Sequence, residues 1–139
     1  MPLREATLAD IEAMHAVRLS VRENVLSDPT RVLPHHYREM LDEHGKGWVF
    51  EDATQVLGFA IADHSRRNIW ALFVAPGFEQ RGIGRSLLDE MVHWLFEQSE
   101  EPIWLTTQTH SRAYRFYQAA GWREVGEPLN GESRFELSR

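Results

Sequence analysis

The sequence contains no cysteine, which excludes disulfide bonds, a thiolate nucleophile and any cysteine-based zinc or iron–sulfur site. No apolar run approaches the roughly 18 residues that suggest a membrane-spanning helix. The N-terminal segment also lacks the apolar stretch of a secretory signal peptide. These absences predict a cytoplasmic protein without a membrane partner.

Positive charge is scarce, with 15 Lys and Arg residues against 21 Asp and Glu residues and a net charge of −6. Because no basic stripe offsets this charge, we expect no nucleic-acid partner. Seven histidines are present, but the adjacent His35 and His36 diverge on a helix, and no His-x-x-x-His pair occurs. We therefore expect no metal site. The sequence also lacks the Gly-x-Ser-x-Gly elbow of a serine hydrolase.

The 139 residues contain no linker rich in proline, glycine or serine, so residues 1–139 are predicted to form a single domain. Hydrophobic periodicity and turn residues predict the element order β-α-α-β-β-β-α-β-α-β-β. The expected strands are 2–6, 48–50, 56–61, 69–74, 103–109, 122–125 and 134–137, and the expected helices are 8–25, 34–45, 82–99 and 111–121. Thr7, Pro34 and Ser111 are expected at helix starts, and Asn130 and Gly131 at a hairpin turn.

The stretch from Phe73 to Arg85 is the most informative part of the sequence. A buried strand ends there, a polar loop containing glycines follows, and an amphipathic helix begins. Helix N-termini carry unpaired N–H donors, and glycine allows the backbone to approach an anion closely. Arg81 and Arg85 add positive charge nearby. The pattern therefore predicts a site for a pyrophosphate.

Two common pyrophosphate motifs do not fit this loop. Gly77 and Gly82 have the spacing of a Walker A loop, but Ile83-Gly84 stands where Lys-Ser/Thr is required. Leu87 occupies the place of the third glycine in the dinucleotide fingerprint. The plain alternative is a glycine-containing turn that binds no ligand.

Two segments resemble motifs of the GNAT family of N-acetyltransferases. Residues 79–84 read Glu-Gln-Arg-Gly-Ile-Gly and resemble the acetyl-CoA signature Gln/Arg-x-x-Gly-x-Gly/Ala, from which they depart at Glu79. Residues 110–122 resemble the pattern Asn-x-x-Ala-x-x-Phe/Leu-Tyr-x-x-x-Gly-Phe, from which they depart at His110. The two segments in this order are more specific than either one alone.

The resemblance implies an α/β fold of the α+β type, with a mixed, mostly antiparallel twisted sheet flanked by helices on both faces. It implies a V-shaped opening between the strands at 69–75 and 103–109, with acetyl-CoA as co-substrate. A backbone N–H of the strand ending at Val74 would polarise the thioester carbonyl. The implied cofactor-binding residues are Leu72, Phe73, Val74, Glu79, Gln80, Arg81, Gly82, Ile83, Gly84, Arg85 and His110.

The same resemblance gives Tyr117 the role of general acid. A phenol with a reference pKa of about 10 can donate a proton to a departing thiolate with a reference pKa of about 8.5. The expected reaction moves an acetyl group from acetyl-CoA to a primary amine by direct attack in a ternary complex. The acceptor would be a small molecule or a peptide, and relatives lead us to expect a homodimer. The alternative for Tyr117 is a purely structural core aromatic.

The sequence does not identify a general base. Some relatives carry a glutamate on the strand before the last motif helix, where this chain has Thr106. Glu51, Asp63, His64 and His110 are candidate replacements, each with the alternative of an ordinary surface residue. A water chain, or an amine of low pKa, would need no dedicated base.

Two other classes of function stay open at this stage. A non-catalytic acyl-CoA-binding module fits the missing base, and turnover with any amine would exclude it. An unrelated nucleotide- or phosphate-binding protein would be stabilised by ATP or NAD rather than by acetyl-CoA.

Overall fold

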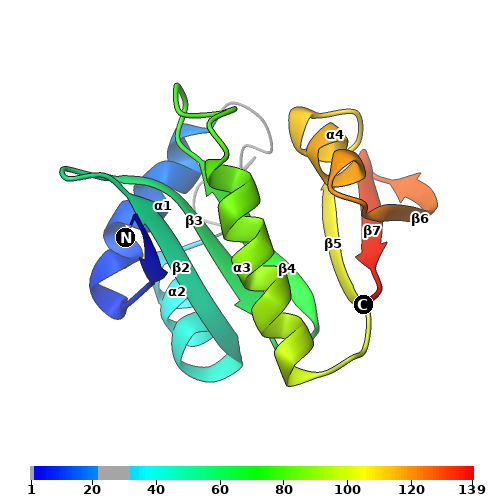
Figure 1. Ribbon diagram of the computed structural model, residues 1–139, viewed down its shortest axis with the longest axis horizontal. Helices are drawn as coiled ribbons and strands as arrows, with labels where there is room; N and C mark the ends of the chain where they lie inside the picture. The colour runs from blue at the N-terminus through cyan, green and yellow to red at the C-terminus, as the bar shows by residue number, and fades with distance from the viewer. Residues whose placement is uncertain (1, 22–31) are drawn as a thin grey trace.

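The computed structural model describes residues 2–21 and 32–139, which form one seven-stranded sheet with helices on both faces (Figure 1). The strand order is β1-β2-β3-β4-β5-β7-β6, and every neighbouring pair is antiparallel except β4 and β5. The strands are β1 Leu3–Glu5, β2 Gly45–Glu51, β3 Val56–Asp63, β4 Asn68–Val74, β5 Ile103–Gln108, β6 Arg123–Leu129 and β7 Glu132–Leu137. The α-helices are α1 Ile11–Ser20, α2 Pro34–Glu39, α3 Ile83–Gln98 and α4 Arg112–Ala119. This confirms the predicted mixed, mostly antiparallel sheet.

Two apolar clusters lie on opposite faces of the sheet. Helices α1 and α2 cover one face, where Phe59 and Ile61 of β3 are fully buried. Helices α3 and α4 cover the other face, where Ala60 and Ala62 of the same strand point. The alternation follows the two-residue period of a strand. Strand β3 is therefore buried on both faces, which explains its nearly continuous apolar sequence.

Strands β4 and β5 are joined at one end and diverge toward the other. Within the described part of the chain, their register links only Asn68 with Trp104. The backbone N–H of Trp104 donates to the carbonyl of Arg67 at 3.0 Å, and the Asn68 side-chain amide donates to the carbonyl of Trp104 at 3.2 Å. The molecule is thus divided into a first arm, β1–β4 with α1–α3, and a second arm, β5–β7 with α4 (Figure 1).

The end of α3 is held near the junction of the arms by Arg67. Its guanidinium donates to the carbonyls of Leu95 and Ser99 at 2.6 and 2.9 Å, and also to the carbonyl of Glu101. The Leu95 carbonyl also accepts the backbone N–H of Ser99 at 3.2 Å, and Ser99 and Glu101 belong to the segment that follows α3. The bonds from Arg67 fix the position of α3 relative to the turn that leads into β4.

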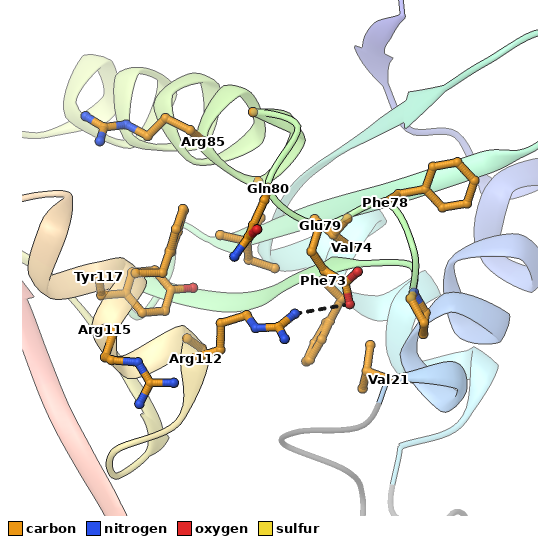
Figure 2. A pocket seen from close by; sticks show the side chains of 16 residues that line it. Val21, Phe73, Val74, Phe78, Glu79, Gln80, Arg85, Arg112, Arg115 and Tyr117 are labelled. Atoms are coloured by element: carbon orange, nitrogen blue, oxygen red, sulfur yellow. Dashed lines mark ion pairs between the residues drawn. The ribbon is translucent and has the colours of Figure 1, made fainter.

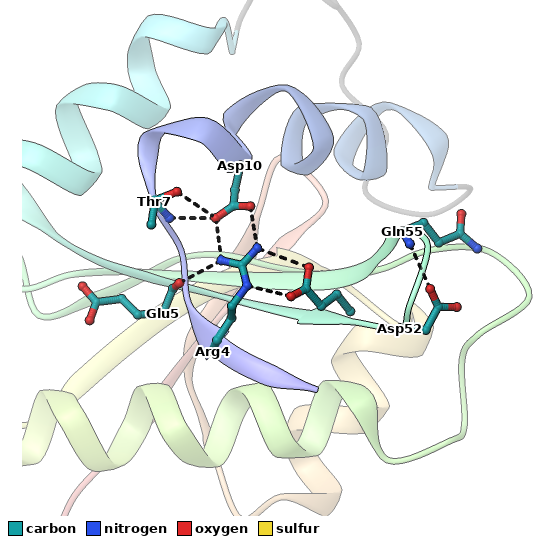
Figure 3. A network of polar contacts seen from close by, with 7 residues as sticks. Arg4, Glu5, Thr7, Asp10, Asp52 and Gln55 are labelled. Carbon is teal, nitrogen blue, oxygen red and sulfur yellow. Dashed lines mark hydrogen bonds and ion pairs between the residues drawn. The ribbon is translucent and has the colours of Figure 1, made fainter. Parts of the chain in front are cut away.

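A charge network anchors the start of the chain (Figure 3). The Arg4 guanidinium donates to both oxygens of Asp10, each at 2.9 Å, and to Glu51 at 2.7 Å. Asp10 also accepts the backbone N–H of Thr7 at 2.8 Å, and its bonds to Arg4 hold the pKa of its carboxyl below the usual range. Thr7 precedes the short 3₁₀ turn Leu8–Asp10 that leads into α1, so it lies at the predicted helix start, but its side chain makes no capping hydrogen bond and Asp10 is the N-cap of α1.

Several predicted element boundaries differ from the structure. Helix α1 ends at Ser20, whose hydroxyl donates to the Val17 carbonyl at 2.7 Å, and Val21 is already extended. Residues 22–25, the rest of the predicted helix, lie outside the described residues. Helix α2 passes into the π-helical turn Met40–His44, and β2 begins at Gly45. The predicted strand began only at residue 48, because the glycines at the start of β2 carry no apolar side chain.

The predicted start of the strand at 122–125 is also wrong by one residue. Trp122 precedes β6 and is buried, with its ring 5.7 Å from that of Tyr117. The hairpin turn between β6 and β7 is as predicted, since Asn130 and Gly131 both have positive φ values, 55° and 79°.

Among the described residues, no helix is long and apolar enough to cross a membrane.

Candidate active site

A cavity of about 550 Å³ lies between the two arms (Figure 2). One wall comes from the end of β4, the loop that follows it and the start of α3, and the other wall comes from α4. The lining residues are Val21, Leu72, Phe73, Val74, Pro76, Phe78, Glu79, Gln80, Gly82, Gly84, Arg85, Arg112, Ala113, Arg115, Phe116 and Tyr117. Strands β4 and β5 diverge as predicted for the opening between 69–75 and 103–109, and the second wall of the cavity comes from α4 rather than from β5.

The loop before α3 has the backbone geometry of an anion site. Gly77, Gln80 and Gly82 have positive φ values of 91°, 61° and 81°. A Cβ added at Gly77 or Gly82 would meet no atom within 4 Å, so open space adjoins the loop backbone. Ser86 donates its N–H to the Gly82 carbonyl at 3.0 Å, and the N–H groups ahead of it at the helix start have no intrahelical acceptor. These donors and the helix dipole favour a negatively charged group.

The end of β4 offers a free strand edge to the cavity. Leu72, Phe73 and Val74 pair with β3 on one side. On the other side, the described pairing with β5 stops at Asn68. An extended ligand can therefore form strand-like hydrogen bonds with this segment.

Tyr117 of α4 brings a phenol to the cavity. Its ring packs against Phe116 at 5.2 Å and Trp122 at 5.7 Å, and Figure 2 shows its hydroxyl pointing into the cavity. The residue is buried, with 6% of its surface exposed, and burial raises the pKa of the phenol above its ordinary value. The group is therefore neutral at physiological pH and able to donate a proton or a hydrogen bond.

Three arginines give the cavity positive charge. Arg85 lies on the first turn of α3 and pairs with Asp89 at 2.9 Å. Arg112 and Arg115 lie three residues apart on the first turns of α4, so they share a side of the helix. The sequence analysis missed these two α4 residues, although their spacing beside the Tyr117 motif was a usable signal.

Most of the predicted cofactor-binding residues line this cavity, but three do not. Ile83, the first residue of α3, is buried in the core, and the Arg81 guanidinium lies 5.1 Å from the Phe78 ring centroid. His110 has a φ of 62° and its ring packs against Tyr114 at 5.3 Å, outside the lining residues. The structure brings together Leu72, Phe73, Val74, Glu79, Gln80, Gly82, Gly84, Arg85 and Tyr117.

The candidate bases lie away from the cavity lining. Glu51 is bound to Arg4, and Asp63 is buried and accepts hydrogen bonds from the Ser65 hydroxyl and the Arg66 N–H. The His64 ring packs against Trp94 at 5.9 Å. Among the described lining residues, Glu79 is the one carboxylate.

The sequence profile of the acetyltransferase (GNAT) family matches residues 11–122, which include all the residues that line the cavity. The chain belongs to the GNAT family. The matched residues include the glycine loop before α3 and the helix that carries Tyr117. None of the curated proteins is a significant match to this sequence.

Solved GNAT structures share the fold over nearly the whole chain. A GNAT acetyltransferase from Staphylococcus aureus Mu50 superposes with a TM-score of 0.82 at 21% identity, covering 98% of this chain and 97% of that one. A ribosomal-protein-alanine N-acetyltransferase from Brucella melitensis gives 0.79 at 21% identity and covers 100% of both chains. Rv2747 from Mycobacterium tuberculosis, solved in complex with CoA, gives 0.78 at 16% identity over 99% of this chain and 98% of that one.

Proposed function

We propose that this GNAT protein binds acetyl-CoA in the cavity between its arms and transfers the acetyl group to a primary amine. The observation that carries the proposal is that a single cavity is lined both by the loop before α3 and by Tyr117. The N–H groups at the start of α3 suit a pyrophosphate, and the free edge of β4 suits an extended pantetheine arm. The open space beside Gly82 leaves room for the phosphates.

In this proposal, the amine attacks the thioester carbonyl directly. The C–N bond forms, the C–S bond breaks, and the Tyr117 hydroxyl gives its proton to the departing sulfur. The proton that the amine loses returns to the phenolate through solvent. A backbone N–H at the end of β4 polarises the carbonyl oxygen. The absence of cysteine agrees with a path that has no thioester-linked acyl-enzyme.

The acceptor class is the part of the reaction to be found by screening. Relatives of the same fold are ribosomal-protein-alanine N-acetyltransferases, from Brucella melitensis and Escherichia coli. Peptides with an N-terminal alanine therefore belong in the panel, together with polyamines, amino acids and aminoglycosides. Each acceptor is assayed by the release of CoA.

The deciding experiment is calorimetric titration of the purified protein with acetyl-CoA, with ATP as the control. The proposal expects acetyl-CoA to bind with a dissociation constant near the micromolar range, about −8 kcal/mol, and ATP to bind far more weakly. A folded sample that does not bind acetyl-CoA would refute the proposal. Binding without turnover of any acceptor would instead support the non-catalytic acyl-CoA-binding module.

A further inference from the structure

An ion pair joins the two arms across the cavity. The Glu79 carboxylate, from the loop before α3, lies 3.3 Å from the Arg112 guanidinium at the start of α4 (Figure 2). Both residues line the cavity. A carboxylate thus stands beside the loop whose backbone favours an anionic ligand.

The other carboxylate oxygen of Glu79 forms a hydrogen bond with the loop itself. It accepts the backbone N–H of Gly77 at 2.7 Å. A carboxylate oxygen on a loop amide makes the same kind of contact as a phosphate oxygen. Glu79 therefore engages, from within the chain, an amide of the loop and a cation that lines the cavity.

These contacts are easy to exchange. The side chains of Arg112 and Glu79 are 59% and 34% exposed, and ion pairs at this exposure contribute little net stability. A phosphate group carries more charge than a carboxylate and binds a guanidinium through two parallel hydrogen bonds. A pyrophosphate entering the cavity can therefore replace Glu79 at Arg112.

We propose that Arg112 is a phosphate-binding residue of the acetyl-CoA site and that Glu79 is the internal competitor that the pyrophosphate displaces. This inference rests on the proposed function. Glu79 acts in two ways: it occupies Arg112 in the unbound protein, and it repels the bound phosphates. Glu79 thereby sets the affinity for acetyl-CoA below what the loop and the arginine would otherwise give.

The test is calorimetric titration with acetyl-CoA of the wild type and of variants at both positions. Glu79→Gln is expected to bind about three- to tenfold more tightly, and Arg112→Gln about tenfold more weakly. Glu97→Gln removes the same charge from the last turns of α3, and Arg123→Gln removes a charge from β6, both outside the cavity lining. These two controls should bind as the wild type does.

The double variant Glu79→Gln/Arg112→Gln separates the two actions of Glu79. If Glu79 competes for Arg112, the gain from Glu79→Gln must shrink when Arg112 is absent. Acetyl-pantetheine, which lacks the pyrophosphate, should bind all variants equally. An unchanged or weaker affinity of Glu79→Gln for acetyl-CoA, or an equal gain in both backgrounds, overturns the inference.

Inorganic pyrophosphate is the probe that keeps this inference distinct from the proposed function. The competition predicts that Glu79→Gln binds pyrophosphate more tightly than the wild type, whether or not acetyl-CoA binds. A gain with pyrophosphate but no binding of acetyl-CoA would leave the competition standing and refute the proposed function. Binding of acetyl-CoA with no effect of Glu79→Gln on either ligand would refute the competition and leave the proposed function standing. If neither the wild type nor Glu79→Gln binds acetyl-CoA or pyrophosphate, both proposals are refuted.

Discussion

The two arms of the molecule differ in how they are covered and in what they bring to the cavity. The sheet of the first arm is packed between α1 and α2 on one face and α3 on the other, whereas α4 packs on the sheet of the second arm. The first arm offers backbone groups, from the end of β4 and the loop before α3, together with the Glu79 carboxylate. The second arm offers side chains, above all Tyr117 and Arg112. Gly82 in the first arm should therefore act on binding through backbone geometry, and Tyr117 in the second arm should act on the chemistry.

The sharpest test of this contrast is Tyr117→Phe. The phenylalanine keeps the ring packing against Phe116 and Trp122 but removes the hydroxyl that points into the cavity. We expect kcat to fall by about a hundredfold or more, the usual contribution of a positioned general acid, with an unchanged dissociation constant for acetyl-CoA. Steady-state kinetics with the best acceptor, and calorimetry with acetyl-CoA, measure the two quantities.

Tyr114→Phe is the matched control on the same helix. The Tyr114 hydroxyl donates to Glu124 at 2.6 Å, and the residue does not line the cavity. Its removal should leave kcat near the wild-type value. Unchanged turnover in Tyr117→Phe, or equal losses in both variants, would make Tyr117 a structural aromatic and end its assignment as the acid.

Gly82→Ala tests the backbone side of the contrast. Gly82 has a φ of 81°, and an alanine there costs about 1–2 kcal/mol in the left-handed conformation. The loop is expected to relax and to move its N–H groups, so the affinity for acetyl-CoA should fall about tenfold. kcat at saturation should change much less, because Tyr117 lies on the other arm.

Gly84→Ala is the companion variant two residues later. Gly84 lies within α3, and its added Cβ would lie 3.6 Å from Val74 Cγ2, an ordinary contact. Alanine also favours a helix over glycine by about 1 kcal/mol. Acetyl-CoA affinity should therefore stay within about threefold of the wild type. Equal losses for Gly82→Ala and Gly84→Ala would show that space, not backbone conformation, controls the loop.

The sequence predicted the parts of the cavity that depend on short stretches of chain. The glycine loop, the start of α3 and the place of Tyr117 on its helix follow from local spacing, because a few residues determine a turn or a helix face. The fold class followed from the same two motifs. These are the regions where the prediction and the structure agree most closely.

The other features of the site depend on how the two arms pack together, which the sequence does not reveal. No local pattern indicates that Arg112 lies opposite Glu79, because that contact depends on how far β4 and β5 diverge beyond Asn68. The motif also did not predict where the His110 side chain lies. His110 has a positive φ, and its ring packs against Tyr114. Sequence alone likewise continued the first helix past Ser20, because Val21 keeps the helical period while its backbone is extended.

The smallest expected effect concerns alkaline pH. Burial raises the pKa of Tyr117 above its ordinary value of about 10, so the phenol stays protonated through pH 9. The folded state favours the neutral phenol, and this preference is fully present below the unfolded pKa and is lost as pH rises through the folded one. Wild-type kcat should therefore show no decline between about pH 7 and 9, and any rise there belongs to deprotonation of the acceptor amine. A decline in this range that tracks a single ionisation of the enzyme would mean that the proton donor has a pKa below about 9, and Tyr117 would then not be the donor.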